Sequence, residues 1–352
     1  MRIGIFDPYL DDLGGGEKYM MKIAECLSQK NDVSVFWDGF NDIKSLSERF
    51  ALDLSRISIV KNIFSPKVNF LKRVIESKKY DAIIFLSDGS IPFVLSGKLF
   101  IHIQQPLKIK RNSIKGKIKV SRVTNFFCNS EYTRSFIKEK SVVLYPPVEI
   151  KAKNITKENI ILHVGRFRVL DALTGAKDYK KQYFMIDVFK KMIKRGLKNW
   201  RFILAVSVNK NEGSVFNELR NKALDFPIHF EVNKSNADLW KFYSKAKIYW
   251  HASGFGEDLE KHPEYAEHFG ISTAEAMGGG AVPVVINAGG QKEIISNNQD
   301  GFLWNTEEEF IEKTKELIEN ESLLLKMSKK AKEKALKFNS EKFCLNLQKI
   351  IE

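Results

Sequence analysis

Short apolar runs alternate with amphipathic stretches along nearly the whole chain, and this alternation constrains the fold more than any other feature. Runs such as 2–6, 80–87 and 99–104 have the length and residue types of buried β-strands. The stretches between such runs, for example 17–29, carry apolar residues at helical spacing. Buried strands joined by helices predict parallel sheets with crossover connections. The sequence therefore predicts an α/β fold.

The alternation breaks once, at 146–159, where two prolines and polar residues replace the apolar period. It then restarts with a strand-like run at 160–165 and a strongly periodic helical stretch at 180–196. A chain of 352 residues also exceeds the size that one hydrophobic core usually supports. We therefore predict two domains and a last helix whose apolar residues find their surface on the N-terminal half, with bounds 1–150, 151–332 and 333–352.

Composition indicates a globular protein, with 43% hydrophobic and 28% charged residues. No run approaches the ~20 apolar residues that span a bilayer, and the first ten residues have a strand pattern instead of a secretory signal. Cys26, Cys128 and Cys344 are widely spaced and lack metal-ligand spacing. We expect three free, buried thiols in a reducing cytoplasm.

The net charge of +14 comes from lysines spread over the chain, but it is densest at 107–122, where no acidic residue occurs. Such a stretch could meet anionic lipid headgroups, nucleic acid or a phosphorylated substrate, or it could be a solvated loop. Zinc-finger spacing, an RNP-like aromatic run and a heptad-linked basic region are all missing, so we expect no nucleic-acid partner. The functional interpretation is a peripheral contact with an anionic membrane surface.

In open parallel sheets, ligands bind in the loops beyond the carboxyl ends of the strands. The first such loop ends in glycines, and Gly15 and Gly16 would let backbone amides and a helix N-terminus approach an anion. The loop lacks the dinucleotide-binding G-x-G-x-x-G spacing and the P-loop lysine. The alternative is a flexible turn in which Glu17 favours the helix dipole.

Two further loops carry candidate ligands. His102, at the end of a strand, could orient or polarise a sugar hydroxyl, or it could be a satisfied structural histidine. Arg166 follows a strand, and Lys180 and Lys181 begin the next helix, where a positive charge opposes the dipole. A guanidinium and an ammonium at this place make physical sense if a diphosphate lies between them.

The stretch "EHFGISTAE" (267–275) holds two glutamates. Ser272 and Glu275 fit a capping box, with the serine at the N-cap. That structure would explain neither Glu267 nor the Phe269–Gly270 pair. The candidate metal ligands nearby match no ligand spacing, so we predict no metal site; they are His251, Asp258, His262 and His268.

Taken together, these motifs resemble retaining glycosyltransferase family 4. The resemblance covers nearly the whole chain, and it rests on motifs in the family's order: "GGGE" (14–17), "HIQQP" (102–106), "NSEYT" (129–133), "VGRF…KK" (164–181), the two glutamates separated by seven residues, and "GG" (289–290). Within the family, the sequences of these motifs are similar to those of lipid-linked-oligosaccharide α-1,2-mannosyltransferases that use GDP-mannose, and to those of bacterial polysaccharide glycosyltransferases.

The resemblance implies a GT-B fold, in which two Rossmann-like domains face each other across a cleft. The acceptor would bind the N-terminal domain and the sugar nucleotide the C-terminal one. It also implies a set of roles: Glu267 contacts the donor sugar; Phe269, Gly270 and Ile271 offer backbone amides; Glu275 holds the ribose; Arg166 with Lys180 or Lys181 neutralises the diphosphate; Gly15 and Gly16 lie beside the phosphates; and His102 is the acceptor-side histidine. The sequence departs from the family in a longer Arg–Lys gap and an acidic insert at 253–266.

These observations predict a cytoplasmic, membrane-peripheral enzyme. It would move a hexose, with mannose favoured, from a GDP- or UDP-sugar to a glycan or lipid-linked acceptor, with retention and without a metal or other cofactor. The alternatives are a GT-B-type nucleotide-sugar epimerase and a non-enzymatic, basic nucleic-acid-binding α/β protein.

Overall fold

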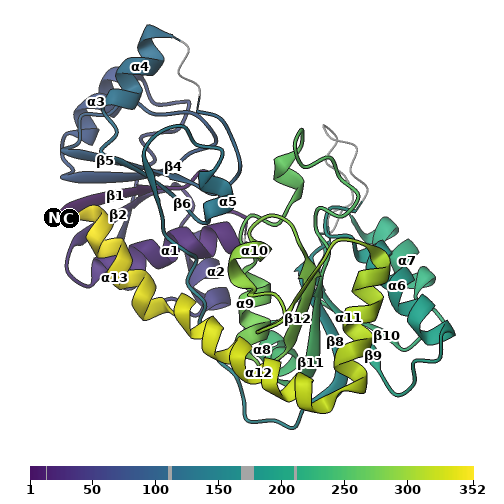
Figure 1. Cartoon of the computed structure of the whole chain (residues 1–352). Helices are drawn as coiled ribbons and strands as arrows, with labels where there is room; N and C mark the ends of the chain where they lie inside the picture. Colours follow the sequence, from purple (N-terminus) through teal and green to yellow (C-terminus); the bar gives the residue numbers. More distant parts are fainter. Residues whose placement is uncertain (13, 110–112, 168–177, 210–211) are drawn as a thin grey trace. The chain divides into compact units, whose positions relative to one another are not determined.

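The computed structural model describes residues 1–12, 14–109, 113–167, 178–209 and 212–352 (Figure 1). The chain divides into two compact units. Unit 1 comprises Met1–Pro147 and Ser340–Glu352, and unit 2 comprises Val148–Asn339. The boundaries thus fall at 147 and 339, where the sequence indicated 150 and 332.

Unit 1 is built on a parallel sheet in which the described residues form seven strands, in the order β3-β2-β1-β4-β5-β6-β7. The strands are β1 (Arg2–Phe6), β2 (Asp32–Phe36), β3 (Ile57–Val60), β4 (Ala82–Leu86), β5 (Lys98–Ile103), β6 (Asn125–Cys128) and β7 (Ser141–Val143). The helices are α1 (Gly15–Ser28), α2 (Phe40–Phe50), α3 (Phe70–Ser77), α4 (Ile114–Ser121), α5 (Glu131–Arg134) and, from the end of the chain, α13 (Ser340–Ile351).

Both faces of this sheet are apolar, as expected for central parallel strands. In β4 every residue of "AIIFL" is buried, and alternate side chains enter different clusters. Ile84 packs in the cluster that contains α1, whereas Ile83 packs in the cluster on the opposite face. The run is short, β-branched and buried on both sides, which explains why the sequence pattern identified it as a strand.

Unit 2 repeats the design with a parallel sheet of six described strands, in the order β10-β9-β8-β11-β12-β13. The strands are β8 (Glu158–Arg166), β9 (Arg201–Ser207), β10 (Ile228–Val232), β11 (Ala246–His251), β12 (Val282–Ile286) and β13 (Phe302–Trp304). The helices are α6 (Gln182–Lys194), α7 (Gly213–Lys222), α8 (Asn236–Lys245), η2 (Pro263–Tyr265), α9 (Ile271–Gly278), α10 (Gln291–Ile294), α11 (Glu307–Glu319), α12 (Glu321–Ala335) and η3 (Leu336–Phe338).

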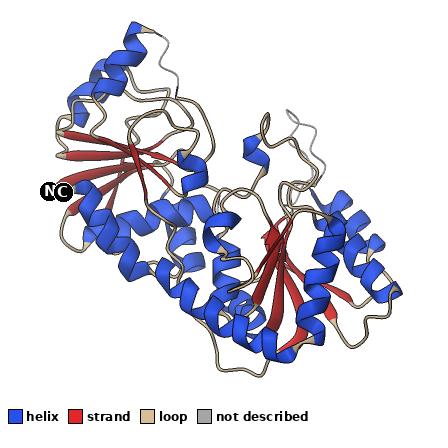
Figure 2. Cartoon of the chain, viewed as in Figure 1, coloured by secondary structure: helices blue, strands red, loops and turns tan. Residues whose placement is uncertain are grey.

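Figure 2 shows helices flanking the sheet of each unit, and this confirms the prediction of two Rossmann-like α/β domains. The core of unit 2 contains packed aromatic rings. Trp250 of β11 packs against Phe310 of α11 with ring centroids 4.5 Å apart, and Trp304 stacks on the same phenyl ring with centroids 4.4 Å apart. The sheet order places β8 beside β11, so the loops that follow these two strands begin at the same edge.

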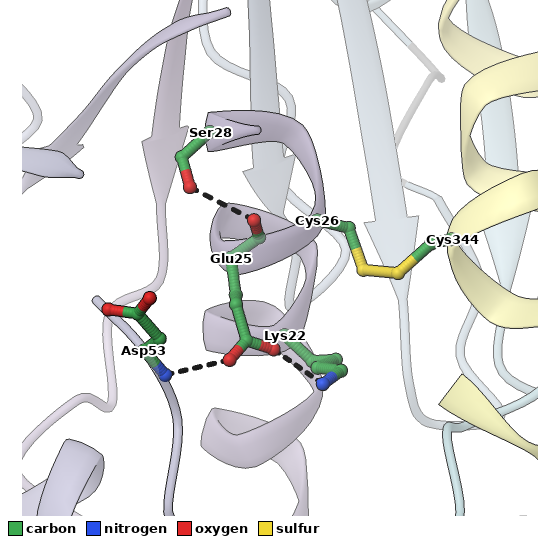
Figure 3. Close-up of a disulfide and its surroundings, with 6 residues drawn as sticks. All are labelled: Lys22, Glu25, Cys26, Ser28, Asp53 and Cys344. Atoms are coloured by element: carbon green, nitrogen blue, oxygen red, sulfur yellow. Dashed lines mark hydrogen bonds and ion pairs between the residues drawn. A yellow bond between two sulfur atoms is a disulfide. The ribbon is translucent and has the colours of Figure 1, made fainter. Parts of the chain in front are cut away.

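The cysteine prediction is wrong for two of the three residues. Cys26 of α1 and Cys344 of α13 form a disulfide (Figure 3). Cys128 is free and buried. Cysteines 318 residues apart give no sequence signal of pairing, but α13 packs on α1 with Phe343 edge-on to Tyr19 at 5.2 Å. This packing brings the two Cα atoms to 5.5 Å, which is bridging distance.

Over the residues that the model describes, no helix has both the length and the apolar character needed to cross a bilayer.

Candidate active site

Glu267 lies in the loop between β11 and α9, and two positively polarised groups meet on one of its carboxylate oxygens. Lys180 Nζ and His251 Nε2 each lie 2.8 Å from Oε2. Burial alone would raise the pKa of Glu267, but the Lys180 ammonium and the His251 hydrogen bond outweigh it and hold the pKa well below its ordinary value. The carboxylate is therefore ionised, and its side chain remains 19% exposed.

His251, the last residue of β11, is the buried partner in this group. The Ser253 backbone N–H donates to His251 Nδ1 at 3.4 Å, so the ring proton belongs on Nε2, which donates to Glu267. Burial lowers the pKa of His251, and this effect outweighs the Glu267 carboxylate, which raises the pKa. A neutral imidazole thus holds the glutamate, a contact that the sequence pattern, which suggested His251 only as a metal ligand, does not indicate.

Lys180 and Lys181 take different partners. Lys181 is the N-cap of α6, in left-handed backbone with φ 57°, and its ammonium pairs with Glu257 in the acidic insert. The aliphatic part of the Lys180 side chain lies against Gly165. A Cβ added to Gly165 would lie 3.6 Å from Lys180 Cγ and 3.0 Å from His163 Nε2. Among the two lysines, the structure therefore brings Lys180 to Glu267.

Arg166 ends β8, at the same sheet edge as His251. Its carbonyl oxygen accepts a hydrogen bond from Gln182 Nε2 at 3.3 Å, which ties the strand to the first residue of α6. The inserted segment between Arg166 and Lys180 lies, at 168–177, outside the described residues.

The capping-box prediction for α9 is wrong. The helix begins at Ile271 with Gly270 as N-cap, so Ser272 lies inside the first turn and its hydroxyl accepts from Tyr249 Oη at 2.8 Å. Glu275 is buried and its Oε2 accepts a hydrogen bond from Tyr243 Oη at 3.0 Å. The structure thus holds Glu275 through a side-chain partner on α8.

Glycines fix the backbone around Glu267. Gly270 has a φ of 114°, which strongly favours glycine, and its Cβ would lie 2.9 Å from Gln291 Nε2. A Cβ on Gly289 would lie 2.3 Å from the Glu267 carbonyl oxygen, and Gly290 N donates to that oxygen at 2.8 Å. Phe269 itself turns into the core against Phe338, at 5.3 Å. The "FG" and "GG" motifs therefore shape one loop.

The glycine loop of unit 1 leads directly into α1, whose first residues are Gly15 and Gly16. Gly16 accepts a hydrogen bond from Gln104 Nε2 at 3.2 Å, and a Cβ there would lie 2.4 Å from Gln104 Oε1. Glu17 accepts from the Gly14 N–H at 2.8 Å and so caps the helix. The backbone here closes against the "HIQQP" segment.

His102 is buried at the end of β5, stacked between Tyr19 at 4.4 Å and Phe127 at 4.5 Å. Its Nδ1 donates to the Phe127 carbonyl at 3.1 Å, so Nε2 is left as an acceptor, and burial lowers the pKa to about 3. Among the described residues Nε2 has no hydrogen-bond partner. A neutral, rigid ring therefore offers one lone pair to a donor such as a hydroxyl.

Asp7, the first residue after β1, presents a similar unsatisfied atom and was not singled out in the sequence analysis. It is fully buried, its Oδ1 accepts from Tyr9 N at 2.9 Å, and its Oδ2 lacks a partner within the described chain. Burial raises the pKa of Asp7 to about 7, with Glu17 adding to the effect. Its position directly after a strand was the available signal.

In the part of the chain that the model describes, no three His, Cys, Asp or Glu side chains are placed to hold a metal ion. The candidates from the sequence have other partners. Asp258 pairs with Lys261 at 2.8 Å, His262 with Glu264 at 3.2 Å, and His268 Nε2 lies 3.2 Å from the Glu264 carbonyl oxygen.

Residues 147–334, more than half of the chain, match the family model described as "Glycosyl transferases group 1". The chain belongs to this family. The match contains Glu267, Lys180, His251 and the loop around them, and it confirms the predicted resemblance at the level of group 1 glycosyltransferases. It favours the transferase prediction over the epimerase and nucleic-acid-binding alternatives.

Curated relatives of this group 1 glycosyltransferase carry the name GDP-Man:Man(3)GlcNAc(2)-PP-Dol alpha-1,2-mannosyltransferase. The Dictyostelium discoideum protein is 27% identical over 228 residues, which cover 60% of this chain and 42% of that protein. The human protein is 24% identical over 220 residues, covering 57% and 41%. This chain therefore spans less than half the length of the relatives it matches.

Solved glycosyltransferase structures share the fold over the full chain. A glycosyltransferase from Rickettsia africae has a TM-score of 0.74 at 15% identity and covers 100% of this chain and 98% of its own. Anabaena HepE in complex with UDP has a TM-score of 0.72 at 18% identity, with 100% and 99% covered. These likenesses confirm the GT-B fold expected for a group 1 glycosyltransferase.

Proposed function

We propose that this chain transfers a hexose from a GDP- or UDP-sugar to a glycan or lipid-linked acceptor, with retention at the anomeric carbon. The observation that carries the proposal is the ionised Glu267, held between Lys180 and His251 in the unit that matches the glycosyltransferase family. Mannose is the favoured hexose, because the curated relatives are named for it.

The departing nucleoside diphosphate needs positive charge at the sheet edge. When the bond from the anomeric carbon to the diphosphate oxygen breaks, negative charge builds on that oxygen, and preorganised cations stabilise it. We assign this role to Arg166, the last residue of β8, and to Lys180, which follows β8 in the chain and pairs with Glu267. Lys180 would leave Glu267 for the diphosphate, and with these cations the transfer needs no metal.

The glutamates would then hold the donor. Glu267 would accept hydrogen bonds from sugar hydroxyls near the reacting carbon, because its ionised oxygens are acceptors only. His251 keeps its hydrogen bond to Glu267 after Lys180 has moved, so the carboxylate stays oriented. We assign the ribose hydroxyls to Glu275 and backbone contacts to the 269–271 turn at the start of α9.

Unit 1 would supply acceptors and amides of its own. His102 Nε2 is a lone-pair acceptor without a partner in the described chain, which suits a sugar hydroxyl. Gly15 and Gly16 begin a helix and offer amides to a phosphate or sugar oxygen. Asp7 adds a second buried acceptor on the loop that leads to α1.

We propose that the enzyme is in peripheral contact with a membrane; the Cys26–Cys344 disulfide removes the support that three free thiols gave to a reducing cytoplasm. Two observations support the membrane contact: the curated relatives are named for a dolichol-linked substrate, and the basic stretch at 107–122 carries no acid. Within this stretch Lys110 and Arg111 lie outside the described residues.

A thermal-shift and transfer screen with UDP-, GDP- and ADP-sugars tests the proposal. We expect one sugar nucleotide to raise the melting temperature of the wild type and to donate its sugar, and Glu267→Ala and Arg166→Ala to lose transfer by ~10²-fold or more. Glu260→Ala, an exposed glutamate in the acidic insert, is the matched control and should behave like the wild type.

If no sugar nucleotide stabilises or reacts with the wild type, the transferase proposal fails. If one does, and both site variants transfer at the wild-type rate, the proposal stands and only the residue assignments fail.

A further inference from the structure

Two short helices of unit 1, α3 and α4, expose large apolar side chains. Phe70, Leu71 and Ile75 on α3 and Ile114 and Ile118 on α4 are all between 50% and 79% exposed. Leu71 and Ile75, like Ile114 and Ile118, are four residues apart and so lie on one face of their helix. Single exposed apolar residues are ordinary, but paired stripes on two helices are not.

Both helices have few buried residues, although Val120 of α4 packs against the core of unit 1. Ser77 is the only fully buried residue of α3, and α4 has none. Both helices contact the segment 93–96, between β4 and β5. The Phe70 ring lies tilted against Phe93, with ring centroids 5.7 Å apart, and Arg122, the C-cap of α4, donates to the Ser96 carbonyl at 3.1 Å. Figure 1 shows both helices at the same end of unit 1.

The charges beside these stripes are almost all positive. Residues 70–79 and 113–122 contain a single acid, Glu76, which pairs with Lys79 at 2.8 Å. The exposed cations are Lys72, Lys78, Lys79, Lys115, Lys117 and Arg122. Aliphatic and aromatic residues among lysines suit the boundary between headgroups and acyl chains, where each finds its preferred surroundings.

We infer that the α3–α4 surface, defined by the exposed apolar and basic residues of these two helices, binds an anionic lipid bilayer. The apolar stripes enter the acyl boundary, and the lysines meet the headgroup phosphates. The inference extends the proposed lipid-linked acceptor, because it names the face that docks on the membrane. Its test needs no sugar nucleotide, so it stands or fails apart from the transferase proposal.

Co-sedimentation of the full chain with vesicles gives the test, using phosphatidylcholine alone and phosphatidylcholine mixed with phosphatidylglycerol. We expect binding only to the mixed vesicles, weakened by added salt. Lys72→Gln with Lys115→Gln and Lys117→Gln should lower the partition about fivefold for each lysine lost. Leu71→Ser with Ile118→Ser should lower it at least tenfold, even at low salt.

Matched controls lie on unit 2. Leu325 and Leu336 are 63% and 52% exposed, and Lys326, Lys329 and Lys330 are exposed lysines of α12. Leu325→Ser with Leu336→Ser, and the three lysines changed to Gln, should leave vesicle binding unchanged. The inference is overturned if the wild type ignores the mixed vesicles, if it binds RNA or DNA instead, or if the control sets lose as much binding as the α3–α4 sets.

Discussion

One carboxylate oxygen of Glu267 contacts both the Lys180 ammonium and the neutral His251 imidazole. We expect a bound ligand to affect these two contacts differently. Lys180 is half of an ion pair that a diphosphate can compete for. His251 is buried and donates to the carboxylate through Nε2. Under the proposed function it is a positioning residue, which keeps Glu267 oriented when the lysine moves to the diphosphate.

This division predicts different outcomes for two substitutions of His251. His251→Leu should lower kcat about ten- to hundredfold, because a hydrogen bond to a charged group is lost, with little change in donor KM. His251→Gln, whose amide nitrogen can reach the place of Nε2, should recover most of the rate. Steady-state transfer rates decide it, and equal losses in both variants would mean that the ring acts only through packing.

Asp7 predicts a pH dependence of stability. Its folded-state pKa of about 7 lies above the ordinary 3.8, so the folded chain holds a proton that the unfolded chain has lost. The stabilising contribution is complete below pH 3.8 and disappears as the pH rises through 7, by about 4 kcal/mol in total. Asp7→Asn mimics the protonated form and should remove this fall.

Urea unfolding at several pH values between 5 and 8 measures the effect. Asp11→Asn, in the same loop but exposed, is the control and should follow the wild type. Parallel pH curves for the wild type and Asp7→Asn would show that Asp7 is already ionised in the folded chain.

At the scale of elements, the loop that carries Glu267 depends on a close backbone contact at Gly289. Gly289 and Gly196 both have positive φ, but a Cβ on Gly196 would meet no described heavy atom within 4 Å, whereas one on Gly289 would clash with the Glu267 carbonyl. Gly196→Ala should cost about 1–2 kcal/mol of unfolding free energy for its backbone conformation alone, and Gly289→Ala should cost more, because its Cβ also meets backbone. Only Gly289→Ala should also weaken donor binding, and equal binding in both variants would contradict the role of this contact.

The disulfide joins two helices that are at opposite ends of the sequence. Cys344→Ser should lower the free energy of unfolding by about 2–4 kcal/mol. A reductant should lower the melting temperature of the wild type to that of the variant and leave the variant unchanged. A wild type indifferent to reductant would contradict the bridge between α1 and α13.

At the scale of the whole molecule, sequence periodicity predicted both parallel sheets because their strands are short, apolar and separated by clear helices. Glu267 could be singled out because no capping pattern explained it. The sequence predicted a capping box that would account for Glu275, but this prediction is wrong, because Gly270 is the N-cap of α9. The disulfide and the His251 contact join residues whose proximity exists only in the folded chain, so no local pattern reports them.

Under the proposed function, unit 2 holds a nucleoside diphosphate through Lys180 beside Glu267, and titration calorimetry with GDP and UDP measures this binding. Lys180→Met should weaken binding at least tenfold, because a charge-assisted contact to the diphosphate is lost. Lys181→Met should bind like the wild type, because the Lys181 ammonium pairs with Glu257 instead. A wild type that binds neither nucleotide, or two lysine variants with equal affinity, would rule out this role of Lys180.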